Sequence, residues 1–278
     1  MRASGLVDHV RGLGAHDHVC WQYDAPADFQ ERVREFLVDG LASGYRVWYT
    51  APGDVSELTE ELRGIDGMDW ALRSGAARVA SLDTTYPVGS VIRPEDQVET
   101  YAAATDQALA DGFAGLRVAA EATRLVLSAE QLDAFARYEY LIDRYMADRP
   151  FSALCAYDRN QLADTAIAQL ACLHPNTNAV VDFRLHAAPG GAPALTGELD
   201  VLSDDLFALA LERAQLEAAS DQVVLDGTGL TFVDHAGLVR LSRHAADRGV
   251  DVVLRTSWPG ASRLVELLHL PRVRVEAA

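Results

Sequence analysis

The chain has 278 residues, of which 49% are hydrophobic and 23% charged, which is enough for two domains with cores of their own and gives no sign of disorder. Its formal net charge of -17 disfavours sequence-independent binding to nucleic acids and to anionic membranes, since both are negatively charged. All 24 basic residues are arginines, which excludes a phosphate-loop lysine and a Schiff-base lysine.

Short apolar runs alternate with amphipathic stretches from Val19 to Cys172, which is typical of a layered α/β domain. Strands are expected over residues 18–23, 46–50, 77–83, 115–122 and 151–158. Helices are expected over residues 26–44, 55–64, 95–112, 129–149 and 160–173. Ser128 and Gln131 predict a capping box at the start of the helix over 129–149.

Turn-forming residues cluster in the segment HPNTN, residues 174–178, where the helical pattern ends. We therefore expect one domain over residues 1–176 and a smaller α/β domain over residues 177–278. The smaller domain begins with an expected strand over residues 179–187 and a Pro/Gly-rich turn.

The three cysteines lie far apart, in or beside apolar runs, which is typical of reduced thiols in the cytoplasm. No run of eighteen apolar residues occurs, and charges interrupt the first twelve residues before a signal-peptide core could form. We expect a cytoplasmic protein with no membrane segment.

The turn after the first main strand, residues 24–28, contains two carboxylates and neither glycine nor lysine. It would repel a triphosphate, so ATP is not expected as a cofactor. Ligands of open parallel sheets bind at the carboxyl ends of the strands. The residues expected at that edge are Asp24, Thr50, Asp83, Glu121, Arg124, Tyr157 and Asp158.

His18 and Cys20 alternate on one expected strand, so their side chains face the same side of the sheet. Together with Cys155, Glu121 or His174 they could form a metal or redox site, since thiolate and imidazole bind zinc, copper and iron. The spacing is not that of a closed zinc motif, and single buried cysteines usually belong to the core. The sequence leaves open whether His18 and Cys20 bind a metal, and it identifies no other cofactor.

Glu121 ends an apolar strand, where it could bind a metal or activate water, or could instead pair with Arg117, Arg124 or another arginine. Aromatic side chains could line a pocket for a small organic ligand or simply pack in the core. These are Trp21, Tyr23, Trp48 and Tyr157.

Two motifs stand out after residue 180. The first is Gly197-Glu198-Leu199-Asp200, and the second is an apolar strand that leads through Asp234 into a helix containing Gly237. In this order, and followed by the strand-like segment RGVDVVLRTS, they resemble the STAS domain of anti-sigma-factor antagonists. The resemblance extends to the end of the chain.

In the STAS family the residue after the aspartate is a seryl or threonyl phosphate acceptor, whereas His235 and Ala236 follow Asp234 here. Phosphorylation of a hydroxyl at these positions is therefore excluded. Asp234 is expected to cap the helix that begins at His235. The resemblance implies a partner-docking surface formed by Asp234, His235, Ala236 and Gly237. His235 could contact the partner or be no more than an exposed residue at the helix start. Thr228 and Thr231 could accept phosphate instead or be structural.

The segment from about residue 16 to residue 174 resembles the MEDS family, a sensory domain of bacterial regulators that respond to small hydrocarbon derivatives. The residues that carry the resemblance are His18, Cys20, Tyr23, Asp24, Arg117, Glu121, Tyr138, Glu139, Cys155, Tyr157, Asp158, His174 and Pro175. The resemblance implies a RecA/KaiC-like layered fold with a largely parallel sheet that lacks a phosphate loop. The sensory pocket that we expect contains His18, Cys20, Tyr23, Asp24, Glu121, Arg124, Cys155, Tyr157 and Asp158.

These features predict a bacterial signalling and transcription regulator, not an enzyme, in which a MEDS-like domain senses a small organic molecule and controls a STAS-like domain. The expected partners are an anti-sigma factor, its kinase or other STAS proteins, and a homo-oligomer is allowed. Two alternatives stay open. One is a metal-dependent hydrolase or another enzyme on a degenerate ATPase fold, and the other is a scaffold that does not sense.

Overall fold

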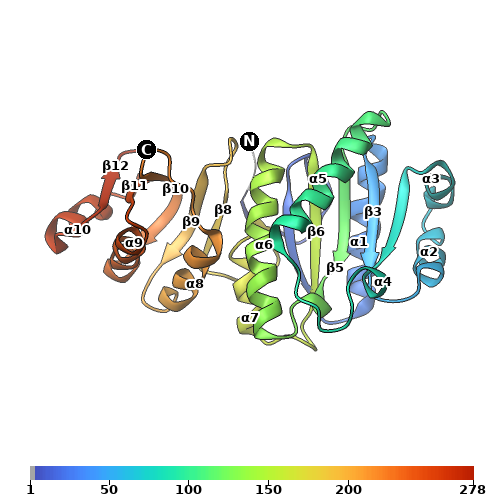
Figure 1. Ribbon diagram of the computed structural model, residues 1–278, viewed down its shortest axis with the longest axis horizontal. Coiled ribbons are helices and arrows are strands. Elements are labelled where there is room, and N and C mark those ends of the chain that lie inside the picture. The colour runs from blue at the N-terminus through green and yellow to red at the C-terminus, as the bar shows by residue number, and fades with distance from the viewer. Residues whose placement is uncertain (1–3) are drawn as a thin grey trace.

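Two β-sheets follow one another along the length of the molecule in the computed structural model, which describes residues 4–278 (Figure 1). The larger sheet has the strand order β1-β7-β2-β6-β5-β3-β4, and every neighbouring pair in it is parallel. Its strands are β1 (Gly5–Leu6), β2 (His18–Tyr23), β3 (Arg46–Ala51), β4 (Ala77–Ser81), β5 (Leu116–Glu121), β6 (Phe151–Asp158) and β7 (Asn176–Thr177). The prediction of an α/β fold with a largely parallel sheet is confirmed.

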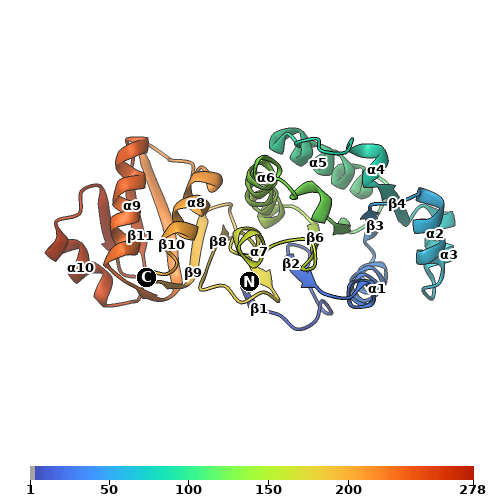
Figure 2. The ribbon, with the colours of Figure 1, turned by 90° about the horizontal axis from the view of Figure 1, so that it is seen from below.

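Helices cover both faces of the larger sheet. Figure 2 shows α5 and α6 on one face and α1 on the other, while α2 and α3 lie near the edge strand β4. The helices are α1 (Pro26–Ala42), α2 (Val55–Arg63), α3 (Met68–Ser74), α4 (Leu82–Thr85), α5 (Pro94–Ala110), the 3-10 turn η1 (Thr123–Leu125), α6 (Ala129–Asp148) and α7 (Asp164–Ala171). Among the described residues, no helix is both long enough and apolar enough to cross a membrane.

The central strand β6 explains why the sheet needs a helix layer on each side. Seven of its eight residues are buried, as expected for a parallel strand covered on both faces. Its side chains alternate, so that Cys155 and Tyr157 face α6 while Leu154 and Ala156 pack on the α1 side. This alternation decides which polar groups can meet.

Helix α6 begins with the capping box predicted from the sequence. The Ser128 hydroxyl accepts a hydrogen bond from the Gln131 amide at 3.2 Å, and the Gln131 side chain accepts one from the Ser128 amide at 3.0 Å. These bonds satisfy amides that the first helical turn would otherwise leave without partners.

The smaller sheet has the order β12-β11-β10-β9-β8, with β8 antiparallel to β9 and the other pairs parallel. Helices α8 and α9 pack side by side on it (Figure 2). Its elements are β8 (Phe183–Ala187), β9 (Pro193–Leu199), α8 (Asp204–Ala214), β10 (Gln222–Val233), α9 (His235–Arg248), β11 (Asp251–Arg255), α10 (Gly260–Leu268) and β12 (Val273–Glu276).

The segment HPNTN differs from the expectation of a turn throughout. Asn176 and Thr177 form the short strand β7, which pairs with β1 on one side and with β2 on the other. The expected strand over 179–187 begins only at Phe183. The cause is pairing with residues near the start of the chain, which turn propensity does not reveal.

The two sheets share one apolar core. Helix α6 packs against both α8 and β8, and α7 also packs against α8. Buried residues of both sheets belong to a single cluster, including Ile142 of α6, Leu185 of β8 and Phe207 of α8. Helix α6 therefore contacts both sheets, and a change in its position alters the packing of both.

We predict that Gly197→Ala destabilises the fold because Gly197 has φ of 92° and a β-carbon there would lie 2.2 Å from the Asp182 carbonyl oxygen. The loss in unfolding free energy should be about 3 kcal/mol or more, measured by urea denaturation. Gly190→Ala is the control, since Gly190 has φ of 84° but open space around it. Its cost should be about 1 kcal/mol, from the left-handed conformation alone. If both variants lost the same unfolding free energy, the backbone of Asp182 would not pack as closely against Gly197 as described.

Candidate functional site

Four buried side chains meet between the larger sheet and α6. They are His18, Glu139, Cys155 and His174, and we call them the buried cluster. One nitrogen, oxygen or sulfur atom from each lies within 4.8 Å of the corresponding atoms of the others. Three of the residues have no solvent exposure, and Cys155 is 5% exposed.

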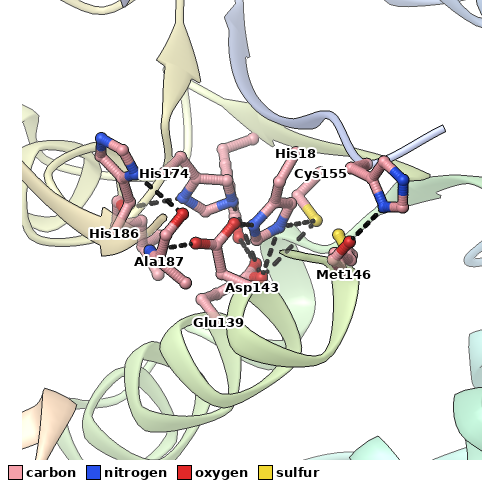
Figure 3. A network of polar contacts seen from close by, with 11 residues as sticks. His18, Glu139, Asp143, Met146, Cys155, His174, His186 and Ala187 are labelled. Carbon is pink, nitrogen blue, oxygen red and sulfur yellow. Dashed lines mark hydrogen bonds and ion pairs between the residues drawn. The ribbon is translucent and has the colours of Figure 1, made fainter. Parts of the chain in front are cut away.

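The sequence brings these residues together through strand and helix periodicity. His18 begins β2 and Cys155 lies in the adjacent strand β6, and both side chains point toward α6. Glu139 is four residues after Phe135 on the buried face of α6, and Asp143 follows one turn later. His174 comes just after α7. Figure 3 shows Glu139 and Asp143 projecting from α6 toward the two histidines.

Glu139 is the centre of the cluster. Its Oε2 atom lies 3.1 Å from His18 Nε2, 3.6 Å from His174 Nε2 and 3.7 Å from Cys155 Sγ. Its other oxygen accepts a hydrogen bond of 2.5 Å from the Tyr157 hydroxyl. Burial opposes ionisation of Glu139, but the facing His18 and the hydrogen bond from this hydroxyl hold its pKa below the ordinary value.

His18 lies between two carboxylates. Its Nε2 faces Glu139, and its Nδ1 is 3.1 Å from Asp143 Oδ1. Burial alone would lower the pKa of His18, but the two carboxylates outweigh it and raise the pKa. The second oxygen of Asp143 accepts a hydrogen bond of 2.7 Å from the backbone amide of Ala187 in β8. Asp143 therefore joins the buried cluster directly to the smaller sheet (Figure 3).

His174 is held as a neutral ring. Burial and the neighbouring His18 lower its pKa to about 4. Its Nδ1 lies 2.9 Å from the carbonyl oxygen of Leu170, which can only accept, so Nδ1 carries the proton. Nε2 then offers a lone pair to the cluster, and it has no hydrogen-bond partner among the described residues. Burial also raises the pKa of the Cys155 thiol well above its ordinary value.

The four side chains are of the types that bind metal ions. Imidazole nitrogen, carboxylate oxygen and cysteine sulfur are the ligands that proteins use for zinc and related cations. The described residues therefore include a buried group that could hold a metal ion.

A small cavity adjoins the cluster at Cys155, on the face of the sheet covered by α5 and α6. Its volume is about 30 Å³, which is room for a water molecule or a ligand of similar size. Its lining is mostly apolar and aromatic, and includes Tyr86, Tyr101, Val118, Phe135, Tyr138 and Cys155.

The residues expected to line a single sensory pocket lie on opposite faces of the larger sheet. His18, Cys155 and Tyr157 lie on the α6 face, whereas Tyr23 and Glu121 meet on the α1 side near the carboxyl ends of the strands. The reason is the two-residue period of a strand, which sends neighbouring residues to opposite faces. The cluster also lies in mid-sheet under α6, and not at the carboxyl edge.

Cys20 does not join the buried cluster, although it faces the same side as His18. It lies opposite Cys155 in the strand pairing, where burial raises the pKa of its thiol and Thr177 is its hydrogen-bond partner. The expected pairing of His18 with Cys20 as metal ligands is thus replaced by His18 with Cys155, Glu139 and His174.

Glu121 pairs with hydroxyl groups and not with an arginine. It accepts hydrogen bonds from the Tyr23 hydroxyl at 3.0 Å and from the Thr123 amide at 3.3 Å, and burial raises its pKa. The expected arginine partners have other contacts, since Arg117 pairs with Asp39 and Arg124 pairs with Asp83.

Of the other predicted edge residues, Thr50 lines the small cavity beside Cys155, and Asp24 and Asp158 lie in local hydrogen-bond networks. Asp24 is 3.4 Å from Arg159, and Asp158 accepts hydrogen bonds from Asn160 and Gln161. Direct contacts between protein groups thus fill much of this edge.

The sequence did not point to Asp143, and it connected Glu139 only with a family resemblance. A usable signal was present. Two acidic residues four apart, inside the apolar stripe of a predicted helix, must face the core and therefore need partners there.

The expected cap at the start of α9 is confirmed. Asp234 Oδ1 accepts a hydrogen bond of 3.0 Å from the Gly237 amide. His235 is exposed, Ala236 is half-buried, and Gly237 packs against Leu199 of β9.

Comparison with known proteins identifies one region of the chain. The family model described as "MEDS: MEthanogen/methylotroph, DcmR Sensory domain" matches residues 17–175, which is more than half of the chain and contains the whole buried cluster. The match ends before the smaller sheet begins. No curated protein matches the chain.

We predict that Glu139→Gln lowers the unfolding free energy by about 3 kcal/mol, because it leaves a buried imidazolium without one of its two counter-charges. Urea denaturation at neutral pH measures the change. Glu130→Gln, in the exposed first turn of the same helix, is the control and should change stability by about 0.5 kcal/mol or less. Equal effects would show that Glu139 does not hold the cluster together.

Proposed function

The chain belongs to the MEDS family of sensory domains, and from this premise we propose that it is a bacterial signalling regulator that passes the state of its buried cluster to a STAS-like output domain. In this proposal residues 1–176 sense and residues 177–278 signal. A small organic molecule is the input, and contact with an anti-sigma factor, its kinase or another STAS protein is the output.

The observation that carries the proposal is the position of Asp143. One of its oxygens faces His18 in the buried cluster, and the other accepts the Ala187 amide of β8. Both contacts are buried, where water does not weaken them. A change in the charge or position of His18 therefore acts on a backbone group of the smaller sheet through one side chain.

A continuous path leads from β8 to the proposed docking surface. β8 pairs with β9 along its whole length, and the last residue of β9, Leu199, accepts a hydrogen bond of 2.9 Å from the Asp234 amide. Asp234 caps α9, where the exposed His235 begins the helix. A shift of β8 would thus reach the start of α9 through two hydrogen-bonded neighbours.

The input is proposed to be a small apolar or weakly polar molecule that enters the cavity beside Cys155. The volume of about 30 Å³ admits a ligand no larger than a few atoms unless side chains move. Such a ligand would lie against a member of the buried cluster, so its binding could alter the cluster directly.

The output assignment rests on the STAS resemblance, and three features support it. Asp234 caps α9 and Gly237 lies close to Leu199, as the motif requires. In addition, Val201 and Leu202 are exposed in the turn after β9. Both residues come just before α8, and exposed apolar residues of this kind fit a protein partner. Because no hydroxyl follows Asp234, the input is proposed to come from the sensory domain and not from phosphorylation at this junction.

The two other functions have weaker support. A metal-dependent hydrolase needs a metal position open to substrate, whereas the buried cluster is closed by side chains with almost no exposure. A scaffold that does not sense would have no need for the buried polar contacts by which Asp143 links His18 to the Ala187 amide of the smaller sheet. We therefore propose the signalling role and no enzymatic activity.

We predict that Asp143→Asn accelerates amide hydrogen exchange in β8, residues 183–187, by on the order of tenfold, because the amide side chain loses the charge that binds both His18 and Ala187. Exchange is followed by mass spectrometry on the intact chain. Asp148→Asn is the matched control, since Asp148 accepts a bond from the Gly190 amide from the same helix but at an exposed site. If both variants leave β8 unchanged, the proposed route is wrong.

We predict that incubation with ATP and an anti-sigma-factor serine kinase leaves residues 234–237 without phosphate, because no hydroxyl is present there. His235→Ser should create an acceptor and gain one phosphate, detected by mass spectrometry of the peptide. A native chain that gains phosphate in this segment, or a His235→Ser variant that gains none while the kinase phosphorylates an ordinary STAS substrate, would contradict the STAS assignment.

A further inference from the structure

We propose that the buried cluster binds one zinc ion through His18 Nε2, His174 Nε2, Glu139 Oε2 and Cys155 Sγ. The proposal is argued from these four side chains alone and does not depend on the signalling role.

Three of the four separations given for the ligand atoms lie in the range of a tetrahedral zinc site, and the fourth is 3.1 Å. Zinc–ligand bonds of 2.0–2.3 Å place the corners of a tetrahedron about 3.3–3.8 Å apart. Four of the six separations can be compared with this range. They are 3.1 Å and 3.6 Å from Glu139 Oε2 to the two imidazoles, 3.7 Å from Glu139 Oε2 to Cys155 Sγ, and 3.6 Å from Cys155 Sγ to His18 Nε2.

Both histidines are oriented as metal ligands. His18 Nδ1 faces the carboxylate of Asp143, and His174 Nδ1 donates to the Leu170 carbonyl. Metal-binding histidines typically use the second nitrogen in this way, which directs the lone pair of the first nitrogen to the ion. His174 Nε2 is buried and has no hydrogen-bond partner among residues 4–278, so a cation at the centre of the cluster would satisfy it.

Glu139 is held in the same manner. The Tyr157 hydroxyl donates to Oε1, which fixes the carboxylate plane and leaves Oε2 facing the other three ligands. His18, His174 and Glu139 thus each have a second hydrogen-bond partner outside the cluster, as ligands in protein metal sites usually do.

The charge of the site also favours a cation. Glu139 is fully buried, and within the described residues no arginine forms an ion pair with it. A buried carboxylate requires a positive partner, which is either a protonated His18 or a bound metal. A divalent ion would supply this charge and would also ionise the thiol of Cys155, since a coordinated cysteine is deprotonated.

The ligand set selects zinc among common cations. Magnesium and calcium prefer six or more oxygen ligands, and this cluster offers one carboxylate oxygen, two nitrogens and a sulfur. Four protein ligands that close the coordination sphere are typical of a non-catalytic zinc site. We therefore expect the ion to be retained tightly.

The first test is the zinc content of the purified intact chain, produced in zinc-supplemented medium and freed of loosely bound metal by dialysis. Plasma mass spectrometry should find one zinc ion per chain. Cys155→Ser and His174→Gln should lower the content at least tenfold. Cys20→Ser is the matched control, since Cys20 is equally buried and next to the cluster but is not a ligand, and it should keep its zinc.

Cobalt(II) replacement provides a readout that does not depend on stability. The native chain and Cys20→Ser should show a thiolate-to-cobalt charge-transfer band in the near ultraviolet. Cys155→Ser should lose this band while circular dichroism shows that it is folded. Tyr157→Phe should keep the band and bind cobalt about tenfold more weakly, because Tyr157 positions Glu139 and does not touch the metal.

Three results would overturn the proposal. They are a folded native chain that takes up no stoichiometric zinc or cobalt, a charge-transfer band that survives Cys155→Ser, and loss of the band in Cys20→Ser. None of them bears on signalling to a partner, so failure of the metal site and failure of the signalling role are distinguishable.

Discussion

The structure depends on one buried arrangement, in which His18 of the larger sheet lies between two carboxylates of α6. Glu139 faces one ring nitrogen at 3.1 Å and Asp143 faces the other at the same distance. In a fully buried position, such charges are stable only when their partners are present. This requirement constrains the position of α6 on the sheet, because Glu139 and Asp143 must both stay within reach of His18.

The same helix connects this arrangement to the smaller sheet. Helix α6 also packs against β8 and α8. The position of α6 that brings its two carboxylates to His18 therefore also sets where α6 contacts the smaller sheet. The Ala187 amide on Asp143 turns this shared packing into a specific contact. A metal or a ligand at the cluster would thus act on the second sheet through a rigid element, and no flexible linker needs to carry the change.

The sequence predicts what depends on local chemistry and misses what depends on packing. The alternation of strands and helices, the Ser128 capping box and the Asp234 cap all follow from neighbouring residues, and all are confirmed. The strand β7 and the α6 carboxylates were missed, because their partners lie far away in the chain. The residues expected in one pocket fall on two faces of the sheet, because neighbouring residues of a strand point to opposite faces even when they end at the same edge.

The most direct test of the central claim is amide hydrogen exchange in the intact His18→Asn variant, followed in β8 and at residues 234–237. His18 lies in β2, which pairs with β6 and β7. Among the described residues, neither β8 nor the segment 234–237 is paired with this strand, so a change there must pass through side chains or packing. If Asp143 carries the coupling, exchange at Ala187 and at the start of α9 becomes faster than in the native chain. If the change in exchange stays within residues 17–175, the cluster does not control the second sheet, and the account is wrong.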